Sequence, residues 1–281
     1  MANEASTGSS VMGAQTQSSV PNTTPTAATN ILEVQHLVKV FGGLRAVNDC
    51  SFTVARGSIV GLIGPNGAGK STAANLITGF LRADAGAVLF DGANIARLPI
   101  YRIAQRGLTR TFQIARELER MTVTENLLAA PHHQAGESFW RGLFSTPAVR
   151  RQEEENLQRA LRLLRDFDLY DLRDEYAMNL SGGQRRLLEL ARVVMTQPTL
   201  LLLDEPFAGI NPVLCARLGE AIGALCHDLG ITFLIIEHNL AMVERLCSTV
   251  IVMALGRVIA EGSMAQLREN PAVVDAYLGE G

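Results

Sequence analysis

The chain has 281 residues, of which 47% are hydrophobic, and its formal net charge is −3. This length fits one large domain or two small ones, and the apolar content suffices for a full buried core. A near-neutral charge excludes the strongly basic balance that is typical of a nucleic-acid binder. The four cysteines form no CxxC pair, so we interpret them as small buried side chains in a reducing cytosol.

The first 30 residues are rich in Ser, Thr, Ala, Gln and Asn and carry little apolar content. Such a segment buries too little to offset its ordering entropy, so we expect a disordered tail over 1–30. It lacks the basic and then apolar pattern of a signal peptide. No apolar run reaches the ~18 residues that span a bilayer, so we expect a soluble chain that meets a membrane only through a partner protein.

The first part of the folded chain is expected to be rich in strands. Loose alternation at 31–41 and 49–54 is typical of half-buried antiparallel strands, and the apolar run at 58–64 is typical of a buried strand. A helix is expected from about Gly69, followed by a strand at 87–92.

The range from about 94 to 196 is expected to be mostly helical, because apolar residues recur there at three and four positions. After it, strands and helices are expected to alternate at 199–206, 212–228, 231–238, 240–246 and 248–256. This alternation predicts an α/β fold with a mainly parallel core sheet, an antiparallel β part and a helical insertion.

A complete phosphate-binding motif, GxxxxGK[ST], follows the predicted strand at 58–64 and opens the next helix. Its residues are Gly64, Pro65, Asn66, Gly67, Ala68, Gly69, Lys70, Ser71 and Thr72. Glycines bring backbone N–H groups close to the phosphates of a nucleotide such as ATP, and the helix N-terminus adds a positive dipole end. Lys70 is expected to reach the β- and γ-phosphates, and the Ser71 hydroxyl to ligate Mg²⁺. The alternative, an ordinary glycine-rich turn, is disfavoured by the strand–loop–helix context.

Two adjacent acids, Asp204 and Glu205, end a run of four leucines that reads as a buried strand. Ligands of open parallel sheets bind at this end of the strands. We expect Asp204 to hold Mg²⁺ through water and Glu205 to polarise an attacking water. Solvated turn acids are the alternative, and the phosphate loop favours the functional interpretation.

The segment LSGGQ, residues 180–184, precedes another predicted helix. Ser181 can cap that helix, and Gly182 and Gly183 expose N–H groups to an anion. A lone SGG would be an ordinary helix cap. With Gln184, however, the segment is the unaltered signature of ABC ATPases, and the chain from about Ile31 resembles that family's nucleotide-binding domain.

The resemblance implies a P-loop NTPase fold of ABC type over 31–281, with a helical subdomain at about 94–196. It also implies roles for three further residues. Phe41 stands where the family has an adenine-stacking aromatic, usually Tyr. Gln113, in RTFQ, resembles the glutamine that senses Mg²⁺ and couples to the membrane subunits. His238 resembles the histidine that contacts the γ-phosphate, although a lone histidine there would more often be a surface residue.

One position departs from the family pattern. After the two acids the family has the sequence Ser-Ala-Leu-Asp, and in this chain Asn211 stands in place of that Asp. In the family, the signature of one subunit closes on ATP held by another. The resemblance therefore implies a second ATPase subunit, identical or not, with transmembrane permease subunits and, indirectly, a substrate-binding protein. The near-neutral charge argues against a nucleic-acid partner, and the resemblance implies a peripheral location on the cytoplasmic face of the inner (plasma) membrane.

Segments 110–113, 121–128, 136–151, 205–212 and 275–279 resemble importers of branched-chain and other hydrophobic amino acids. Urea importers and lipopolysaccharide-transport ATPases share parts of this pattern. A non-transport ABC ATPase and a module that binds nucleotide without cleaving it are further alternatives. Phe139, Trp140 and Phe144 fit docking to a membrane subunit and packing within the insertion equally well.

Overall fold

The computed structural model describes residues 1, 29–111, 116–131 and 147–278. The expectations for Gln113, for the tail before residue 29 and for Phe139, Trp140 and Phe144 lie outside these residues. In the described part, no helix is both long enough and apolar enough to cross a membrane.

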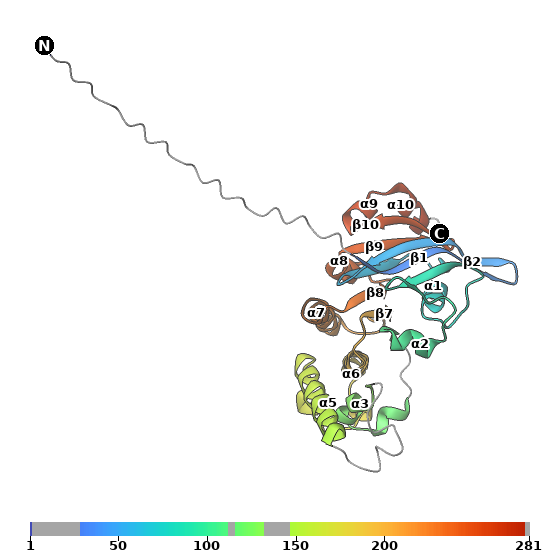
Figure 1. Ribbon diagram of the computed structural model, residues 1–281. Coiled ribbons are helices and arrows are strands. Elements are labelled where there is room, and N and C mark those ends of the chain that lie inside the picture. Colours follow the sequence, from blue (N-terminus) through green and yellow to red (C-terminus); the bar gives the residue numbers. More distant parts are fainter. Residues whose placement is uncertain (2–28, 112–115, 132–146, 279–281) are drawn as a thin grey trace.

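The strands of the described residues form two sheets, and this confirms the predicted fold class (Figure 1). The antiparallel sheet has the order β2-β1-β4-β5, with bounds β1 Asn30–Phe41, β2 Leu44–Ala55, β4 Ala85–Phe90 and β5 Ala93–Asn94. The second sheet has the order β10-β9-β3-β8-β7-β6, with bounds β3 Ile59–Ile63, β6 Leu108–Arg110, β7 Leu200–Asp204, β8 Thr232–Ile236, β9 Thr249–Ala254 and β10 Arg257–Gly262. All its pairings are parallel except that of β10 with β9.

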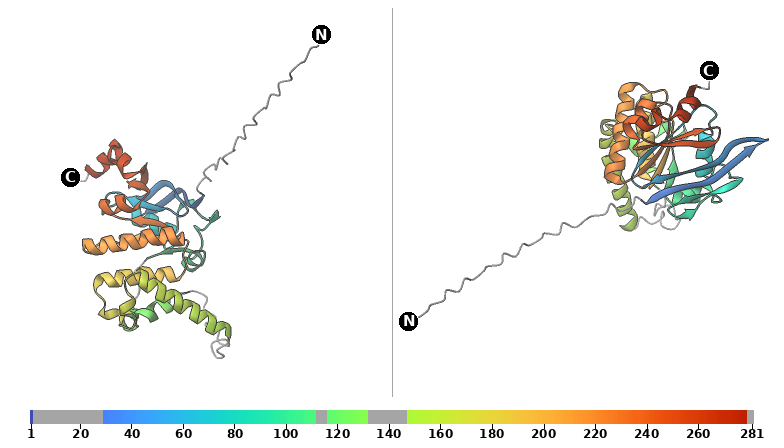
Figure 2. Two further views of the ribbon diagram at one scale, coloured as in Figure 1. Left: turned by 90° about the vertical axis from the view of Figure 1, so that its left-hand side faces the viewer. Right: turned by 90° about the horizontal axis from the view of Figure 1, so that it is seen from above.

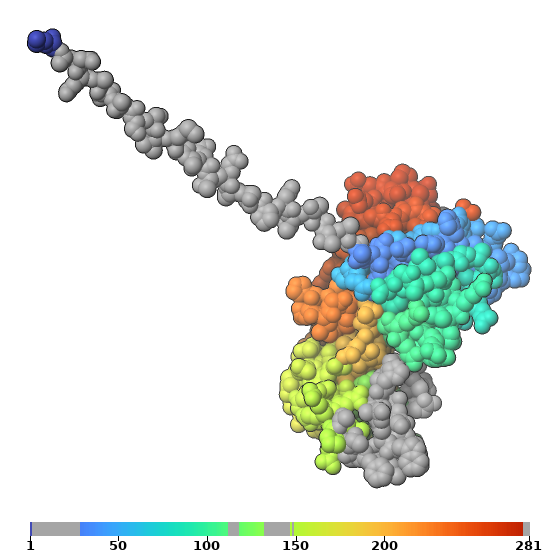
Figure 3. Space-filling view, viewed as in Figure 1, coloured from blue at the N-terminus to red at the C-terminus, as the bar shows by residue number. Residues whose placement is uncertain are grey.

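The helices gather mainly around the larger sheet and at one end of the molecule. Their bounds are α1 Lys70–Ile77, α2 Ile100–Gln105, α3 Val123–Leu128, α5 Pro147–Asp166, α6 Gly182–Met195, α7 Pro212–Leu229, α8 Leu240–Leu246, α9 Met264–Arg268 and α10 Pro271–Leu278. Short 3₁₀ turns lie at Arg116–Arg120, Tyr170–Leu172 and Ala177–Asn179. In Figures 1 and 2, α3, α5 and α6 lie at the end of the molecule opposite α9 and α10, and the space-filling view shows the same two ends (Figure 3).

Three strands were not expected from the sequence: β5 at 93–94, β6 at 108–110 and β10 at 257–262. The range from about 94 to 196 was predicted to be mostly helical, but β6 lies within it and pairs in parallel with β7, Leu108 beside Leu200. A strand of three residues is too short to show a period of its own, and its pairing partner is far away in the sequence. The expectation of a mainly helical segment is therefore wrong at 108–110.

The strand β7 shows how the apolar run at 200–203 builds the core. Successive side chains of a strand point to opposite faces of the sheet. Leu200 and Leu202 belong to a cluster with the antiparallel sheet and α1, whereas Leu201 and Leu203 belong to a cluster with α6 and α7. With both faces covered, the strand is apolar throughout, as is usual in parallel sheets.

Parallel register places the polar residues that follow three of these strands at one edge of the sheet. Ile236 of β8 pairs with Leu62 of β3 on one side and with Asp204 of β7 on the other. The chain after β3 forms the phosphate loop, and the chains after β7 and β8 carry Glu205 and His238.

Candidate nucleotide-binding site

The phosphate loop adopts backbone geometry that requires glycine at two positions. Gly64 has a φ of +150°, and a Cβ there would lie 2.0 Å from the carbonyl oxygen of Met253. Gly69, the N-cap of α1, has a φ of +99°, and its Cβ would lie 2.3 Å from the carbonyl oxygen of Ala46. Any side chain at either position would therefore distort the loop.

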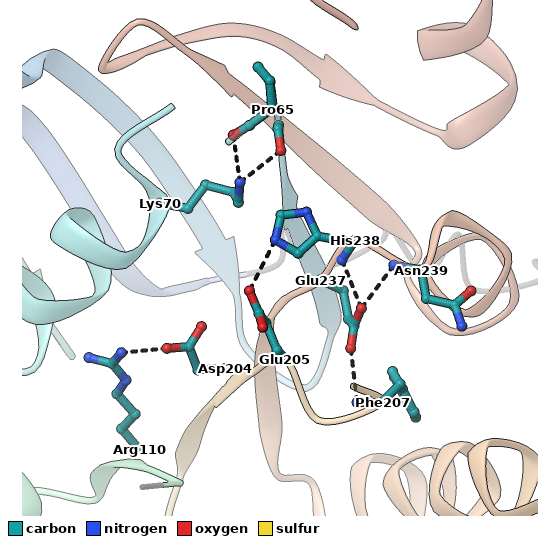
Figure 4. Close-up of polar contacts among 10 residues, drawn as sticks. Pro65, Lys70, Arg110, Asp204, Glu205, Phe207, Glu237, His238 and Asn239 are labelled. Carbon is teal, nitrogen blue, oxygen red and sulfur yellow. Dashed lines mark hydrogen bonds and ion pairs between the residues drawn. The ribbon is translucent and has the colours of Figure 1, made fainter. Parts of the chain in front are cut away.

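The Lys70 ammonium is held inside this loop. Its Nζ donates to the carbonyl oxygens of Gly64 at 2.7 Å and Pro65 at 2.8 Å, and only 6% of the residue is exposed (Figure 4). A buried ammonium with backbone acceptors keeps a fixed position. The cation therefore lies where a phosphate bound to the loop would meet it.

The loop forms one wall of a cavity of about 470 Å³. Residues 66–72 line it together with Glu205 and His238, which lie far away in the sequence. The other wall comes from 44–46 at the start of β2 and from Leu255 and Gly256 in the turn between β9 and β10.

Sequence reasoning missed this second wall. No motif marks Arg45, Ala46 or Gly256, and only the fold brings them to the loop. Phe41, which was expected to stack on adenine, is not among the described residues that line the cavity. It is half exposed and pairs across the hairpin with Leu44, which does line it.

Glu205 and His238 meet across two neighbouring strands. His238 Nε2 lies 3.0 Å from Glu205 Oε1, and both side chains are about half exposed to the cavity side. Glu205 has a φ of +50°, which is uncommon for a residue other than glycine and costs about 1 kcal/mol or more. This left-handed backbone conformation directly follows β7. Glu205 Oε1 contacts His238, whereas the neighbouring Asp204 contacts Arg110.

Asp204 forms an ion pair with Arg110, which was not predicted from the sequence. Arg110 donates from Nη2 to Asp204 Oδ2 at 2.6 Å and from Nη1 to Asn75 Oδ1 at 2.7 Å. The Arg110 side chain is only 3% exposed. Burial lowers the pKa of the Arg110 guanidinium, and its contact with Asp204 opposes that shift. Arg110 therefore ties the end of β7 to α1, and Figure 4 shows its contact with Asp204.

The donor set near the loop fits Mg²⁺ that arrives with a nucleotide. Mg²⁺ keeps several waters and usually takes one or two protein oxygens plus phosphate oxygens, rather than a cage of protein ligands. The described residues contain no group of three or more His, Cys, Asp or Glu side chains that could hold a metal alone. They do offer the Ser71 hydroxyl on the cavity wall, whereas Asp204, directly before Glu205, is not among the described residues that line the cavity.

The signature residues lie at the N-terminus of α6, away from this cavity. Ser181 and Gln184 form a capping box, in which Ser181 Oγ accepts from the Gln184 N–H at 3.3 Å and Gln184 Oε1 accepts from the Ser181 N–H at 2.9 Å. Gly183 packs under Leu214 of α7, where a Cβ would come within 2.0 Å of a methyl group. None of residues 181–184 is among the described residues lining the cavity, so the signature segment and the cavity are separate parts of the described chain.

Asn211, the departure from the family pattern, caps a helix. Its Oδ1 accepts from the Leu214 N–H at 2.9 Å, and Pro212 follows as the first residue of α7. Asn and Asp are about equally good N-caps, so the exchange leaves the helix start intact.

Comparison with known families and structures agrees with this geometry. A family model for ABC transporters matches residues 47–208, and a model described as a branched-chain amino acid ATP-binding cassette transporter matches residues 257–281. The BraF protein of Pseudomonas aeruginosa, a high-affinity branched-chain amino acid transport ATP-binding protein, is 43% identical over 250 residues, covering 89% of this chain and 98% of BraF. A probable branched-chain amino acid transport ATP-binding protein, LivG of Archaeoglobus fulgidus, is 45% identical, covering 89% of this chain and 95% of the relative.

Solved structures lead to the same family. A crystal structure of the ADP conformation of an ATP-binding cassette of an ABC transporter is similar with a TM-score of 0.77 and 39% identity, covering 89% of this chain and 99% of that one. A nucleotide-free cassette gives a TM-score of 0.75 at 38% identity, with the same coverage. The phosphate loop, the signature and these relatives show that this chain belongs to the ABC transporter family, as an ATP-binding and ATP-hydrolysing subunit.

Proposed function

We propose that this chain drives an importer of branched-chain or other hydrophobic amino acids, by hydrolysing ATP together with a second ATPase subunit. The observation that carries the chemistry is the cavity in which the phosphate loop faces the Glu205–His238 pair. The substrate class is supported by the names of the relatives and by the family model at 257–281.

In this proposal the phosphates of ATP lie on the N–H groups of 66–72, with Lys70 beside the β- and γ-phosphates. Ser71, and Asp204 through water, would hold Mg²⁺, which would supply positive charge against the phosphates. Glu205 orients the attacking water and accepts its proton. His238 holds the γ-phosphate and the same water. Phe41 is assigned to stacking on the adenine base, and Gln113 to Mg²⁺ sensing.

The second half-site comes from a partner subunit. The N–H groups of Gly182 and Gly183, with Ser181 and Gln184, form an anion-binding helix N-terminus like that of the phosphate loop. They are not among the residues around this chain's own cavity, which supports their closing on ATP held by the partner. The ATPase pair would lie on the cytoplasmic face of the inner (plasma) membrane, bound to permease subunits that receive substrate from a binding protein.

Reconstitution tests the proposal. The chain, purified with its native membrane partners in lipid, should show ATPase activity that rises with leucine, isoleucine or valine loaded on the binding protein. Stimulation by urea alone, or by no solute, would contradict the amino-acid assignment. Co-purification with DNA or ribosomes in place of membrane proteins would instead indicate a non-transport ATPase, and ATP binding without phosphate release would indicate a non-catalytic module.

A further inference from the structure

A buried acid, Glu237, lies between the two loops that carry Glu205 and His238. It directly follows β8, and only 3% of the residue is exposed. A carboxylate removed from water is costly unless hydrogen-bond donors replace the lost water. Its partners therefore show what holds it in place.

Three backbone N–H groups supply these donors. Glu237 Oε1 accepts from Phe207 at 2.9 Å, and Oε2 accepts from His238 at 2.7 Å and from Asn239 at 2.9 Å (Figure 4). Hydrogen bonds to a carboxylate are stronger than those between neutral groups. One side chain thus joins the loop after β7 to the loop after β8.

The two ends of this bridge lie next to the reacting pair. Phe207 follows Glu205 by two residues, and the His238 N–H belongs to the residue whose ring meets Glu205. The Glu205 backbone is also fixed, because its N–H donates to the Ile236 carbonyl at 2.8 Å and its φ is +50°. Any change in the spacing of the two loops would therefore alter the 3.0 Å contact between His238 Nε2 and Glu205 Oε1.

We infer that Glu237 is a positioning residue for ATP hydrolysis, which sets the distance between Glu205 and His238 by bridging their loops. This inference rests on the proposed function. Glu237 touches neither substrate nor water in this role, and it acts through backbone groups alone. A misplacement of catalytic groups by about 1 Å can cost about 100-fold in rate, so loss of the bridge should appear in kcat and much less in ATP affinity.

Two substitutions separate positioning from simple stability. Glu237→Gln keeps the shape but turns an amide NH₂ toward at least one backbone N–H. Glu237→Asp keeps the charge and can still reach the adjacent N–H groups of 238 and 239, but it is one CH₂ too short for Phe207. Thr232→Val is the matched control, because Thr232 Oγ1 is a fully buried acceptor for the Gly57 N–H at the other end of the same strand.

The measurements are kcat in the complex with membrane partners, and ATP affinity and unfolding midpoint of the full chain. We expect Glu237→Gln and Glu237→Asp to lower kcat by about tenfold or more, with ATP affinity within about threefold of wild type. Thr232→Val should lower the unfolding midpoint and keep kcat. If Glu237→Gln does not fold, Glu237→Asp decides alone.

A kcat that falls less than about fivefold below that of Thr232→Val, or a loss of ATP affinity equal to the loss of kcat, overturns the inference. A wild-type complex that hydrolyses no ATP contradicts the proposed function itself. An active wild type with unaffected Glu237 variants contradicts only the positioning role.

Discussion

His238 Nε2 lies 3.0 Å from Glu205 Oε1, although the two residues are 33 positions apart in the sequence. They meet because β7 and β8 are neighbouring parallel strands, with Asp204 paired to Ile236. Glu205 and His238 follow these two residues closely, so each leaves the sheet at the same edge. The contact joins a carboxylate that can accept a proton to a ring that can hold a phosphate, at the mouth of the phosphate loop.

Replacing Lys70 should weaken nucleotide binding. Lys70→Ala removes a charge-assisted donor toward the phosphates, and we expect the ATP dissociation constant to rise by about 10- to 100-fold. Calorimetric titration of the full chain with ATP and Mg²⁺ measures it. Arg268→Ala is the control, because Arg268 pairs with Glu244 on the surface, away from the residues that line the cavity, and should leave affinity unchanged. Equal affinities for Lys70→Ala and wild type would reject the assigned role.

Replacing Glu205 should stop hydrolysis and preserve binding. Glu205→Gln keeps the side-chain shape but cannot accept a proton from water, and we expect kcat to fall by about 100-fold or more. Phosphate release from the assembled complex measures this, and nucleotide titration checks that affinity is retained. Glu220→Gln, which alters an exposed acid paired with Arg245, should have normal activity. Near-normal turnover of Glu205→Gln would exclude it as the water-positioning base.

Removing Arg110 should destabilise the chain, because it leaves Asp204 without its guanidinium partner. The Arg110 side chain is 3% exposed and that of Asp204 is 20% exposed. Breaking such a buried pair costs about 3 kcal/mol or more. Urea unfolding of Arg110→Ala measures the loss. Arg56→Ala breaks an exposed pair with Asp91 and should cost about 1 kcal/mol or less. Similar losses in the free energy of unfolding for the two variants would contradict the conclusion that the pair of Arg110 with Asp204 stabilises the fold.

Two thiols, the buried Cys50 and the partly buried Cys247, should make the chain sensitive to alkaline pH. Burial raises the pKa of Cys50 from 9.0 to about 12, with a smaller contribution from Asp49, and burial likewise raises the pKa of Cys247 to about 12, with a contribution from Glu237. Because the folded pKa exceeds the unfolded one, this stability is fully present below pH 9 and is lost as pH rises toward 12.

The free energy of unfolding should therefore fall with pH above 9, by at most about 1.4 kcal/mol per pH unit for each thiol. Denaturant unfolding across this range measures the slope, which should be smaller in Cys50→Ala and in Cys247→Ala. Between pH 6 and 8 the slopes of variants and wild type should coincide, which serves as the control. An unchanged slope above pH 9 in both variants would contradict the assignment.

The ends of the predicted elements show which features are local. The helix expected at 240–246 is α8 with the same bounds, because Asn239 caps its start by accepting from the Met242 N–H. The phosphate loop and the LSGGQ segment could also be identified from the sequence. Their residue types and spacing are local patterns and can be recognised without the fold, although the close approach of Met253 to Gly64 and of Ala46 to Gly69 becomes visible only in the structure.

The sequence by itself therefore determined the fold class, the ATP-binding loop, the signature and the candidate acids. Only the tertiary structure decided that β6 joins the sheet, that Arg110 holds Asp204, and that Glu237 bridges the loops of Glu205 and His238. It also separated the signature from the cavity and built the cavity's second wall from β2 and the turn at 255–256. These features depend on parallel strand register and on contacts between residues far apart in the sequence, such as Arg110 and Asp204, which are 94 positions apart, and no local pattern of side chains encodes them.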